Sequence, residues 1–153
     1  MPQARLYAYT NANVMASTSS VMAGQTLLDS YEVYTLFDSG ASHSFISTKL
    51  ALSLSNSSNR TLKLMRIVLL TGEILQLEFF LRQISITING VTLRADLIVI
   101  EIKDFDVILG MDFLGKHNAI INYHHRKVTF IPEDGEYFSF KGRSLLNHKM
   151  IIS

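Results

Sequence analysis

The stretch that decides the fold is Leu36 to Phe45, LFDSGASHSF, in which an apolar run leads straight into a carboxylate and a turn. Asp38 follows two apolar residues and is followed at once by Ser39-Gly40-Ala41. An ionised carboxylate inside a protein is costly unless it is solvated, paired or hydrogen-bonded. One interpretation is that Asp38 caps the turn through the backbone. The other is that it performs chemistry, and this interpretation requires more than one residue.

A carboxylate that activates water to attack an amide works best beside a second carboxylate, because the pair shares one proton and supplies both acid and base. The two titrations then belong to the pair. No second Asp-Ser-Gly or Asp-Thr-Gly triplet occurs, since Asp29-Ser30 precedes Tyr31 and Asp134-Gly135 lacks the hydroxyl residue. An isologous dimer would supply the second acid by bringing identical loops together. The functional interpretation therefore predicts a homodimer with half a site in each chain.

Composition narrows the class of protein. With 153 residues, 48% of them hydrophobic and 18% charged, the chain predicts one globular domain with a sizeable core. A net charge of +1 with scattered basic residues argues against nucleic-acid binding. The absence of cysteine excludes disulfides, cysteine-ligated zinc and thiol nucleophiles, and favours a cytoplasmic location. No apolar run exceeds four residues, so we expect neither a membrane span nor a signal peptide.

The order of segments predicts an all-β domain. Residues 1–20 end in a small, polar stretch that is typical of a flexible linker, so we place the domain at residues 21–131. Residues 132–153 form a C-terminal extension of weaker pattern. Within the domain, short apolar strands alternate with turn signals.

Several turns and one helix can be assigned from local patterns. Asn89-Gly90 gives the strongest hairpin signal, because both turn residues can take positive φ. The arms around Thr71-Gly72 are long, so this hairpin should protrude. Residues 51–60 are rich in Ser and Asn and predict a loop, whereas residues 111–118 predict one short helix that ends at Gly115 or Asn118. Further turns are predicted at Asp29-Ser30, at His124-His125-Arg126 and around Asp134-Gly135.

Three segments together carry a family resemblance: LFDSGASHSFIS (36–47), FDVILGMDFL (105–114) and AIINYHHRKVTF (119–130). The pattern resembles retropepsin-type aspartic proteases, especially those of Ty3/Gypsy long-terminal-repeat retrotransposons of plants. The resemblance implies an all-β, retropepsin-like closed barrel with one short helix. It also implies a homodimer whose active site lies on the symmetry axis, with one flap hairpin from each subunit closing over a polypeptide substrate.

The resemblance also implies roles for residues in the turn after the first apolar strand. Asp38 is similar to the catalytic aspartate, and Ser39 to the hydroxyl residue that braces the pair of acids. Gly40 and Ala41 are similar to the turn beneath the substrate. Gly40 also permits close backbone approach, and its amide can donate to the carboxylate.

Outside that turn, the segment Leu70-Thr71-Gly72-Glu73 resembles the tip of the flap, and Ile108 resembles a wall of the substrate pocket. Gly110 and Asp112 match structural positions, with Asp112 capping the helix. Two departures stand beside these matches. Retroviral relatives often place an acid and an arginine, which pair near the dimer interface, where this chain has Ser42 and Met111.

The resulting hypothesis is an aspartic endopeptidase that processes a Gag-Pol-like polyprotein without a metal or other cofactor. The alternative is a domesticated retropepsin fold that dimerises or binds peptides without catalysis. His124 and His125 are adjacent and have no acid or histidine four residues away, which favours a polar hairpin tip over a metal site.

Overall fold

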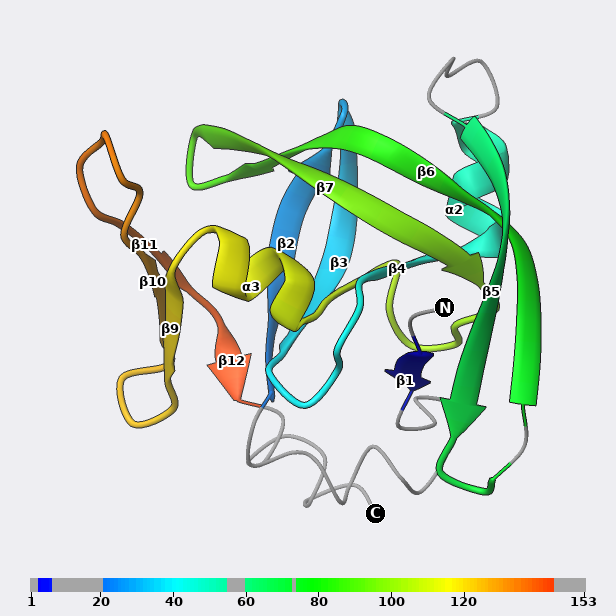
Figure 1. Ribbon diagram of the computed structural model, residues 1–153. Helices are drawn as coiled ribbons and strands as arrows, with labels where there is room; N and C mark the ends of the chain where they lie inside the picture. Colours follow the sequence, from blue (N-terminus) through cyan, green and yellow to red (C-terminus); the bar gives the residue numbers. More distant parts are fainter. Residues whose placement is uncertain (1–2, 7–20, 55–59, 73, 145–153) are drawn as a thin grey trace.

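The computed structural model describes residues 3–6, 21–54, 60–72 and 74–144, and strands predominate in them (Figure 1). The strands are β1 (Gln3–Leu6), β2 (Val21–Leu28), β3 (Tyr31–Asp38), β4 (Phe45–Ser47), β5 (Arg60–Leu69), β6 (Ile74–Ile88), β7 (Val91–Ile100), β8 (Val107–Leu109), β9 (Ala119–Asn122), β10 (Lys127–Phe130), β11 (Phe138–Lys141) and β12 (Arg143–Ser144). The helices are α2 (Thr48–Ser53) and α3 (Met111–Lys116). No helix in the described ranges is long and apolar enough to cross a membrane.

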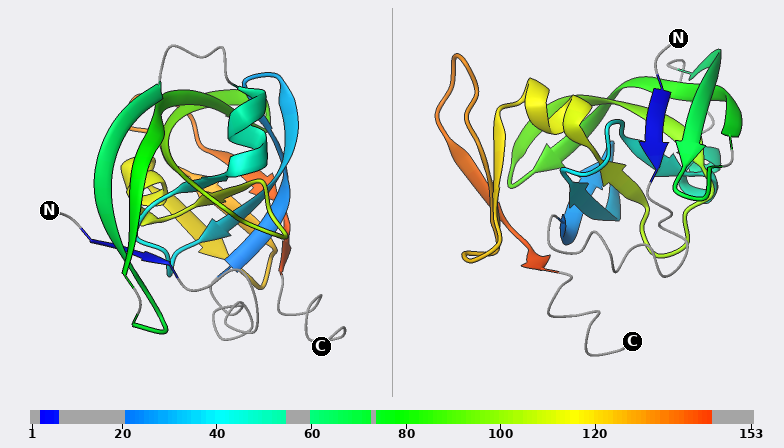
Figure 2. Two further views of the ribbon diagram at one scale, coloured as in Figure 1. Left: turned by 90° about the vertical axis from the view of Figure 1, so that its right-hand side faces the viewer. Right: turned by 60° about the horizontal axis from the view of Figure 1, so that its bottom comes forward.

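Six strands form a closed barrel, as the sequence predicted. Their hydrogen-bonded order is β6-β7-β4-β8-β3-β2, and β2 pairs again with β6 to close the ring. The last pairing joins Leu27 to Thr87 and Leu28 to Ile86. The right-hand view in Figure 2 shows the barrel beside the three-stranded sheet of β9, β10 and β11. A closed ring leaves few strand edges open to unwanted pairing.

The predicted hairpin turns are found where the turn residues indicated. Asp29 lies between β2 and β3 with φ +54°, and Asn89 and Gly90 join β6 to β7 with φ +49° and +82°. Positive φ at both central residues suits the right-handed twist of the strands. The pairing of β9 with β10 and of β10 with β11 confirms the hairpins expected around residues 124–126 and 134–135.

The longest strand differs from the sequence prediction. The sequence pattern predicts separate strands at residues 73–81 and 83–88, on either side of Arg82, but β6 runs as one strand from Ile74 to Ile88. Leu81 pairs with Leu97, and Ile84 pairs with Ala95. The two residues between them on β6, Arg82 and Gln83, therefore face the single residue Asp96 on β7, which is a β-bulge. Gln83 has φ +54°, and its backbone N–H donates to Asp96 Oδ1 at 2.8 Å. The bulge is stabilised by a residue on the neighbouring strand.

The loop prediction for residues 51–60 is wrong at its start, because α2 covers residues up to Ser53. Ser47 is the N-cap of this helix, and its Oγ accepts a hydrogen bond from the Leu50 amide at 3.1 Å. Serine is among the preferred residues at this position. The other helix, α3, was predicted, and Asn118 just beyond it takes φ +52° as a helix end requires.

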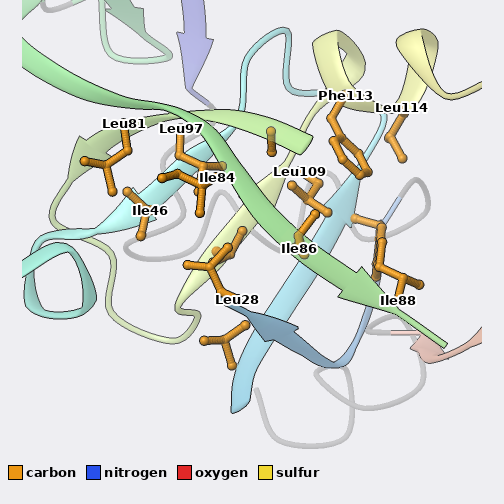
Figure 3. Packing of buried hydrophobic residues seen from close by; sticks show 14 of the residues in the cluster. Leu28, Ile46, Leu81, Ile84, Ile86, Ile88, Leu97, Leu109, Phe113 and Leu114 are labelled. Atoms are coloured by element: carbon orange, nitrogen blue, oxygen red, sulfur yellow. The ribbon is translucent and has the colours of Figure 1, made fainter. Parts of the chain in front are cut away.

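The main core lies between the barrel wall and α3. Figure 3 shows Ile84 and Ile86 of β6 in one cluster with Leu97 of β7, Leu109 of β8 and Phe113 of α3. Alternate residues of β6 are buried in its C-terminal half, as expected for a strand with one face on a core. A smaller cluster, centred on Leu36, Ala41, Phe45 and Ile108, lies behind the turn after β3.

Strands also occur within both segments that the sequence assigned to the ends. In residues 1–20, β1 pairs in parallel with β5. In residues 132–153, β11 pairs with β10 and β12 pairs with β2. Phe140 of β11 is buried and lies 5.2 Å from Phe37, measured between ring centroids. The domain boundaries at residues 20 and 131 stay a prediction.

Candidate active site

Asp38 is the last residue of a central strand of the barrel. It pairs with Val21 of β2 on one side, and the preceding Phe37 pairs in parallel with Leu109 of β8 on the other. Leu36 and Phe37 are fully buried, which anchors the end of the strand. The Asp38 side chain is itself 0% exposed. The apolar strand therefore delivers its acid into the protein interior and not onto the surface.

The turn after Asp38 determines the electrostatics of its carboxyl group. The backbone N–H of Gly40 donates to Asp38 Oδ1 at 2.7 Å, and the N–H of Ala41 donates to the Asp38 carbonyl at 3.2 Å. Burial raises the pKa of Asp38 from 3.8 to about 6, against the smaller opposing effect of the Gly40 amide. A carboxyl group with this pKa can gain or lose a proton in the range where acid–base catalysis operates.

The segment beyond this turn lies against the start of α3. Met111 N–H donates to the Ala41 carbonyl at 2.7 Å, and Asp112 N–H donates to the Ser42 carbonyl at 3.3 Å. Gly110 has no room for a side chain, because a Cβ there would overlap the His43 carbonyl oxygen and lie 2.6 Å from that of Ala41. A side chain at position 110 would therefore clash with the loop after Asp38, and the structural role of Gly110 stays a prediction.

Asp112 stabilises the first turn of α3 in a different way from the predicted cap. Gly110 occupies the N-cap position, and Asp112 lies within the first turn. Its Oδ1 accepts hydrogen bonds from Phe113 N–H at 2.8 Å and from the Ser44 hydroxyl at 2.6 Å. Phe113 N–H also donates to the Gly110 carbonyl at 3.0 Å, so the carboxylate shares this amide with the backbone.

The buried hydrogen bonds of Ser44 were not predicted from the sequence. This residue is fully buried, and its Oγ accepts a hydrogen bond from Gly110 N–H at 3.0 Å while donating to Asp112. Its partners lie more than sixty residues away in the chain. The available signal was a serine directly before a buried strand, which requires a hydrogen-bond partner.

The remaining predicted site residues lie at the tip of the β5–β6 hairpin, in the turn after β3 and in β8. The tip of the β5–β6 hairpin and the turn after β3 project at the same, lower end of the barrel in Figure 1. Leu70 and Thr71 are exposed there, and Gly72 has φ +91°. Glu73 lies outside the described residues. These positions fit a flap, and their part in substrate binding stays a prediction.

Ser39 and Ile108 differ in their exposure. Ser39 is exposed beside Asp38, and its role in bracing a pair of acids stays a prediction. Ile108 is 0% exposed and packs in the smaller core cluster with Ala41. A role for Ile108 as a pocket wall stays a prediction.

The histidines fit the polar hairpin tip that the sequence favoured. His124 and His125 are exposed in the turn between β9 and β10, with ring centroids 5.1 Å apart. Within the described ranges, no three His, Cys, Asp or Glu residues are grouped so that they could hold a metal ion.

Comparison with known proteins gives one family match and similar solved structures. The family described as retroviral aspartyl protease matches residues 1–136. No curated protein matches the chain. The retroviral protease-like domain of Ddi1 from Leishmania major is similar in structure, with a TM-score of 0.63 and 19% identity over 80% of this chain and 94% of that one.

A second similar structure is EIAV protease in complex with the inhibitor HBY-793. Its TM-score is 0.53, at 22% identity over 65% of this chain and 90% of that one. At these identities both likenesses show a shared fold. Together with the family match over most of its length, they lead to one conclusion: the chain belongs to the retroviral aspartyl protease family.

Proposed function

We propose that this chain is an aspartic endopeptidase whose active form is a homodimer with one Asp38 from each subunit. The observation that carries the proposal is the buried carboxyl group of Asp38, the last residue of a central strand. This group accepts a hydrogen bond from the Gly40 amide and has a pKa of about 6. The sequence supports the dimer, because the chain contains a single Asp-Ser-Gly triplet.

In the proposed mechanism, a water molecule is held between Asp38 and the partner subunit's Asp38. The ionised acid takes a proton from the water while the water oxygen attacks the scissile carbonyl carbon, and the protonated acid donates its proton to the carbonyl oxygen, which gives a tetrahedral gem-diol. The gem-diol collapses when the C–N bond breaks: the leaving amine takes a proton from the acid pair, and one gem-diol hydroxyl returns a proton to the pair as the carboxylic acid forms. One proton is again shared by the two carboxyl groups at the end of the cycle.

The substrate we propose is a Gag-Pol-like polyprotein of a Ty3/Gypsy retrotransposon of the plant type. The support is the combination of Asp38-Ser39-Gly40-Ala41 with the ILGMD segment at residues 108–112, which resembles that group. The exposed apolar side chain of Leu70 on the hairpin tip favours apolar residues on either side of the cleaved bond. The cleavage chemistry needs no metal or other cofactor.

The test compares the purified chain with Asp38→Asn on a polypeptide whose junction has apolar residues on both sides, at mildly acidic pH. We expect cleavage by the unchanged chain and none by the variant, with a dimer in sedimentation at the concentration used. Equal cleavage by both proteins, or by neither across a broad pH range, would contradict the proposal. A dimer that binds the peptide without cleaving it would favour the non-catalytic alternative.

A further inference from the structure

The buried hydroxyl group of Ser44 adds side-chain hydrogen bonds to the backbone contacts between the segment after Asp38 and the start of α3. Ser44 donates to Asp112 Oδ1 at 2.6 Å and accepts from Gly110 N–H at 3.0 Å. A serine hydroxyl has one proton to donate, so the bond to Asp112 fixes its orientation. The 2.6 Å separation lies in the range of charge-assisted O–H···O⁻ bonds. Ser44 therefore makes directed bonds to both the end of β8 and the start of α3.

The backbone at Gly110, beside this hydroxyl group, is closely packed against the loop formed by residues 41–44. Gly110 packs against the Ala41 and His43 carbonyls so closely that no Cβ fits. Its amide points at Ser44 Oγ, and without that oxygen the buried N–H would lack the hydrogen-bond acceptor that the structure gives it. Loss of the hydroxyl should therefore push Gly110 away from the loop formed by residues 41–44.

Displacement of Gly110 would reach Asp38 through neighbouring bonds. The Ala41 carbonyl is held by Met111 N–H, the next amide after Gly110. Ala41 directly follows Gly40, whose N–H donates to Asp38 Oδ1. The same turn also holds Ala41 N–H on the Asp38 carbonyl. The position of the Gly40 amide on the carboxyl group thus depends on the contact between residues 41–44 and residues 110–112.

We propose that Ser44 and Asp112 are positioning residues that hold the Asp38 turn in place, with Ser44 acting through Gly110 and Asp112 orienting the Ser44 hydroxyl. Their effect on catalysis rests on the proposed function, whereas their effect on the Gly40–Asp38 hydrogen bond does not. An acid in the first turn of α3 would also favour the helix dipole, but that effect needs no contact with Ser44.

The experiment measures amide hydrogen exchange residue by residue in the folded full chain, well below the unfolding temperature. We expect Ser44→Ala and Asp112→Ala each to speed exchange at Gly40 and Met111 by about tenfold or more, the effect of losing one hydrogen bond to a charged group. Ser44→Thr keeps the hydroxyl and should restore slow exchange. The double variant should be no faster than the faster single variant, because both changes remove the same contact.

Thr26→Val is the matched control. Thr26 and Thr35 form another buried hydroxyl pair, 2.8 Å apart, on strands β2 and β3. This variant also loses a buried hydroxyl group, so it should reduce stability while leaving Gly40 exchange unchanged. Unchanged Gly40 exchange in Ser44→Ala, or an equal rise in Thr26→Val, would overturn the proposal. If Ser44→Ala does not fold, Asp112→Ala gives the same decision, because Asp112 is at the surface.

Activity supplies a second readout when the chain cleaves peptide. Ser44→Ala should lower kcat by about tenfold or more with KM changed less than about threefold, because the acid is misplaced and not the flap. Ser44→Thr should restore kcat. A chain that cleaves nothing would contradict the proposed function alone, since the exchange measurement still decides the role of Ser44 and Asp112.

Discussion

The Gly40 amide donates to Oδ1 of Asp38 across 2.7 Å inside a turn where the acid has no exposed surface. The two influences act in opposite directions, since burial raises the pKa of Asp38 and the amide lowers it. Burial is the stronger effect, and the pKa reaches about 6. The carboxyl group of Asp38 is therefore half protonated at a pH of about 6.

The first prediction concerns stability and pH. Because the folded-state pKa of Asp38 lies above its ordinary value of 3.8, the folded state binds the proton more tightly than the unfolded chain. The contribution is fully present below about pH 4 and is lost as pH rises through about 6, with a size of roughly 3 kcal/mol. Asp38→Asn should therefore raise the free energy of unfolding relative to the unchanged chain at about pH 7.5 and barely change it at about pH 3.5.

Urea denaturation at the two pH values, at a protein concentration where the chain is monomeric, measures this difference. Asp134→Asn is the control, since Asp134 is exposed. The same difference at both pH values would show that the burial of Asp38 does not determine its titration.

The second prediction concerns the rate of peptide cleavage. The proposed mechanism needs one protonated and one ionised carboxyl group, and a second acid nearby favours retention of the shared proton. With Asp38 at a pKa of about 6 in the single chain, kcat/KM should fall as pH rises above that value. Initial rates on one peptide at constant ionic strength measure the profile. A flat rate from about pH 6 to about pH 8 would contradict a shared proton.

The third prediction compares two glycines on either side of one short segment. In Gly110→Ala, the added Cβ would overlap backbone carbonyls of the loop after Asp38, so we expect a loss of about 3 kcal/mol or more in the free energy of unfolding. Gly115 lies inside α3 with only the Met111 side chain near, at 3.9 Å. Gly115→Ala should instead stabilise by about 0.5–1 kcal/mol. Equal effects in thermal denaturation would contradict the close packing at Gly110.

The fourth prediction concerns the C-terminal segment. Phe140 is buried against Phe37 of the strand that ends in Asp38, whereas Tyr137 is 72% exposed. Phe140→Ala should cost about 3–5 kcal/mol, and Tyr137→Ala should change stability by less than about 0.5 kcal/mol. Denaturant titrations of both variants give the comparison. A small effect at Phe140 would contradict a stabilising contact between β11 and the barrel.

Much of the barrel could be predicted because its signals are local. Alternating apolar residues and the pair Asn89-Gly90 determine a hairpin through backbone preferences of neighbouring residues. The helix at residues 111–116 was found for the same reason, whereas the closure of the barrel was implied by the family resemblance and not by local patterns. The bulge at Gln83 was not, because its left-handed backbone is stabilised by Asp96 on another strand. The helix at residues 48–53 was missed because serine-rich sequence hid the cap at Ser47.

The candidate site was predictable only in part. Asp38 and the turn after it stand out in the sequence, since an acid that follows an apolar strand has to be explained. The importance of Ser44 depends on contacts with Gly110 and Asp112, which only the folded chain brings near. Hydrogen bonds between distant segments leave no periodic trace in a sequence.

The seam of the barrel has a mechanical consequence. β2 shares eight residue pairs with β3 but two with β6, and those two lie beside the Asp29 turn. β4 and β8 also share two pairs, so the ring has two equally short joints. Opening of the β2–β6 joint would leave Asp38, at the opposite end of β3, paired with Val21 and anchored through Phe37 on β8. Local loosening at the Asp29 end of β3 would therefore leave the acid in register.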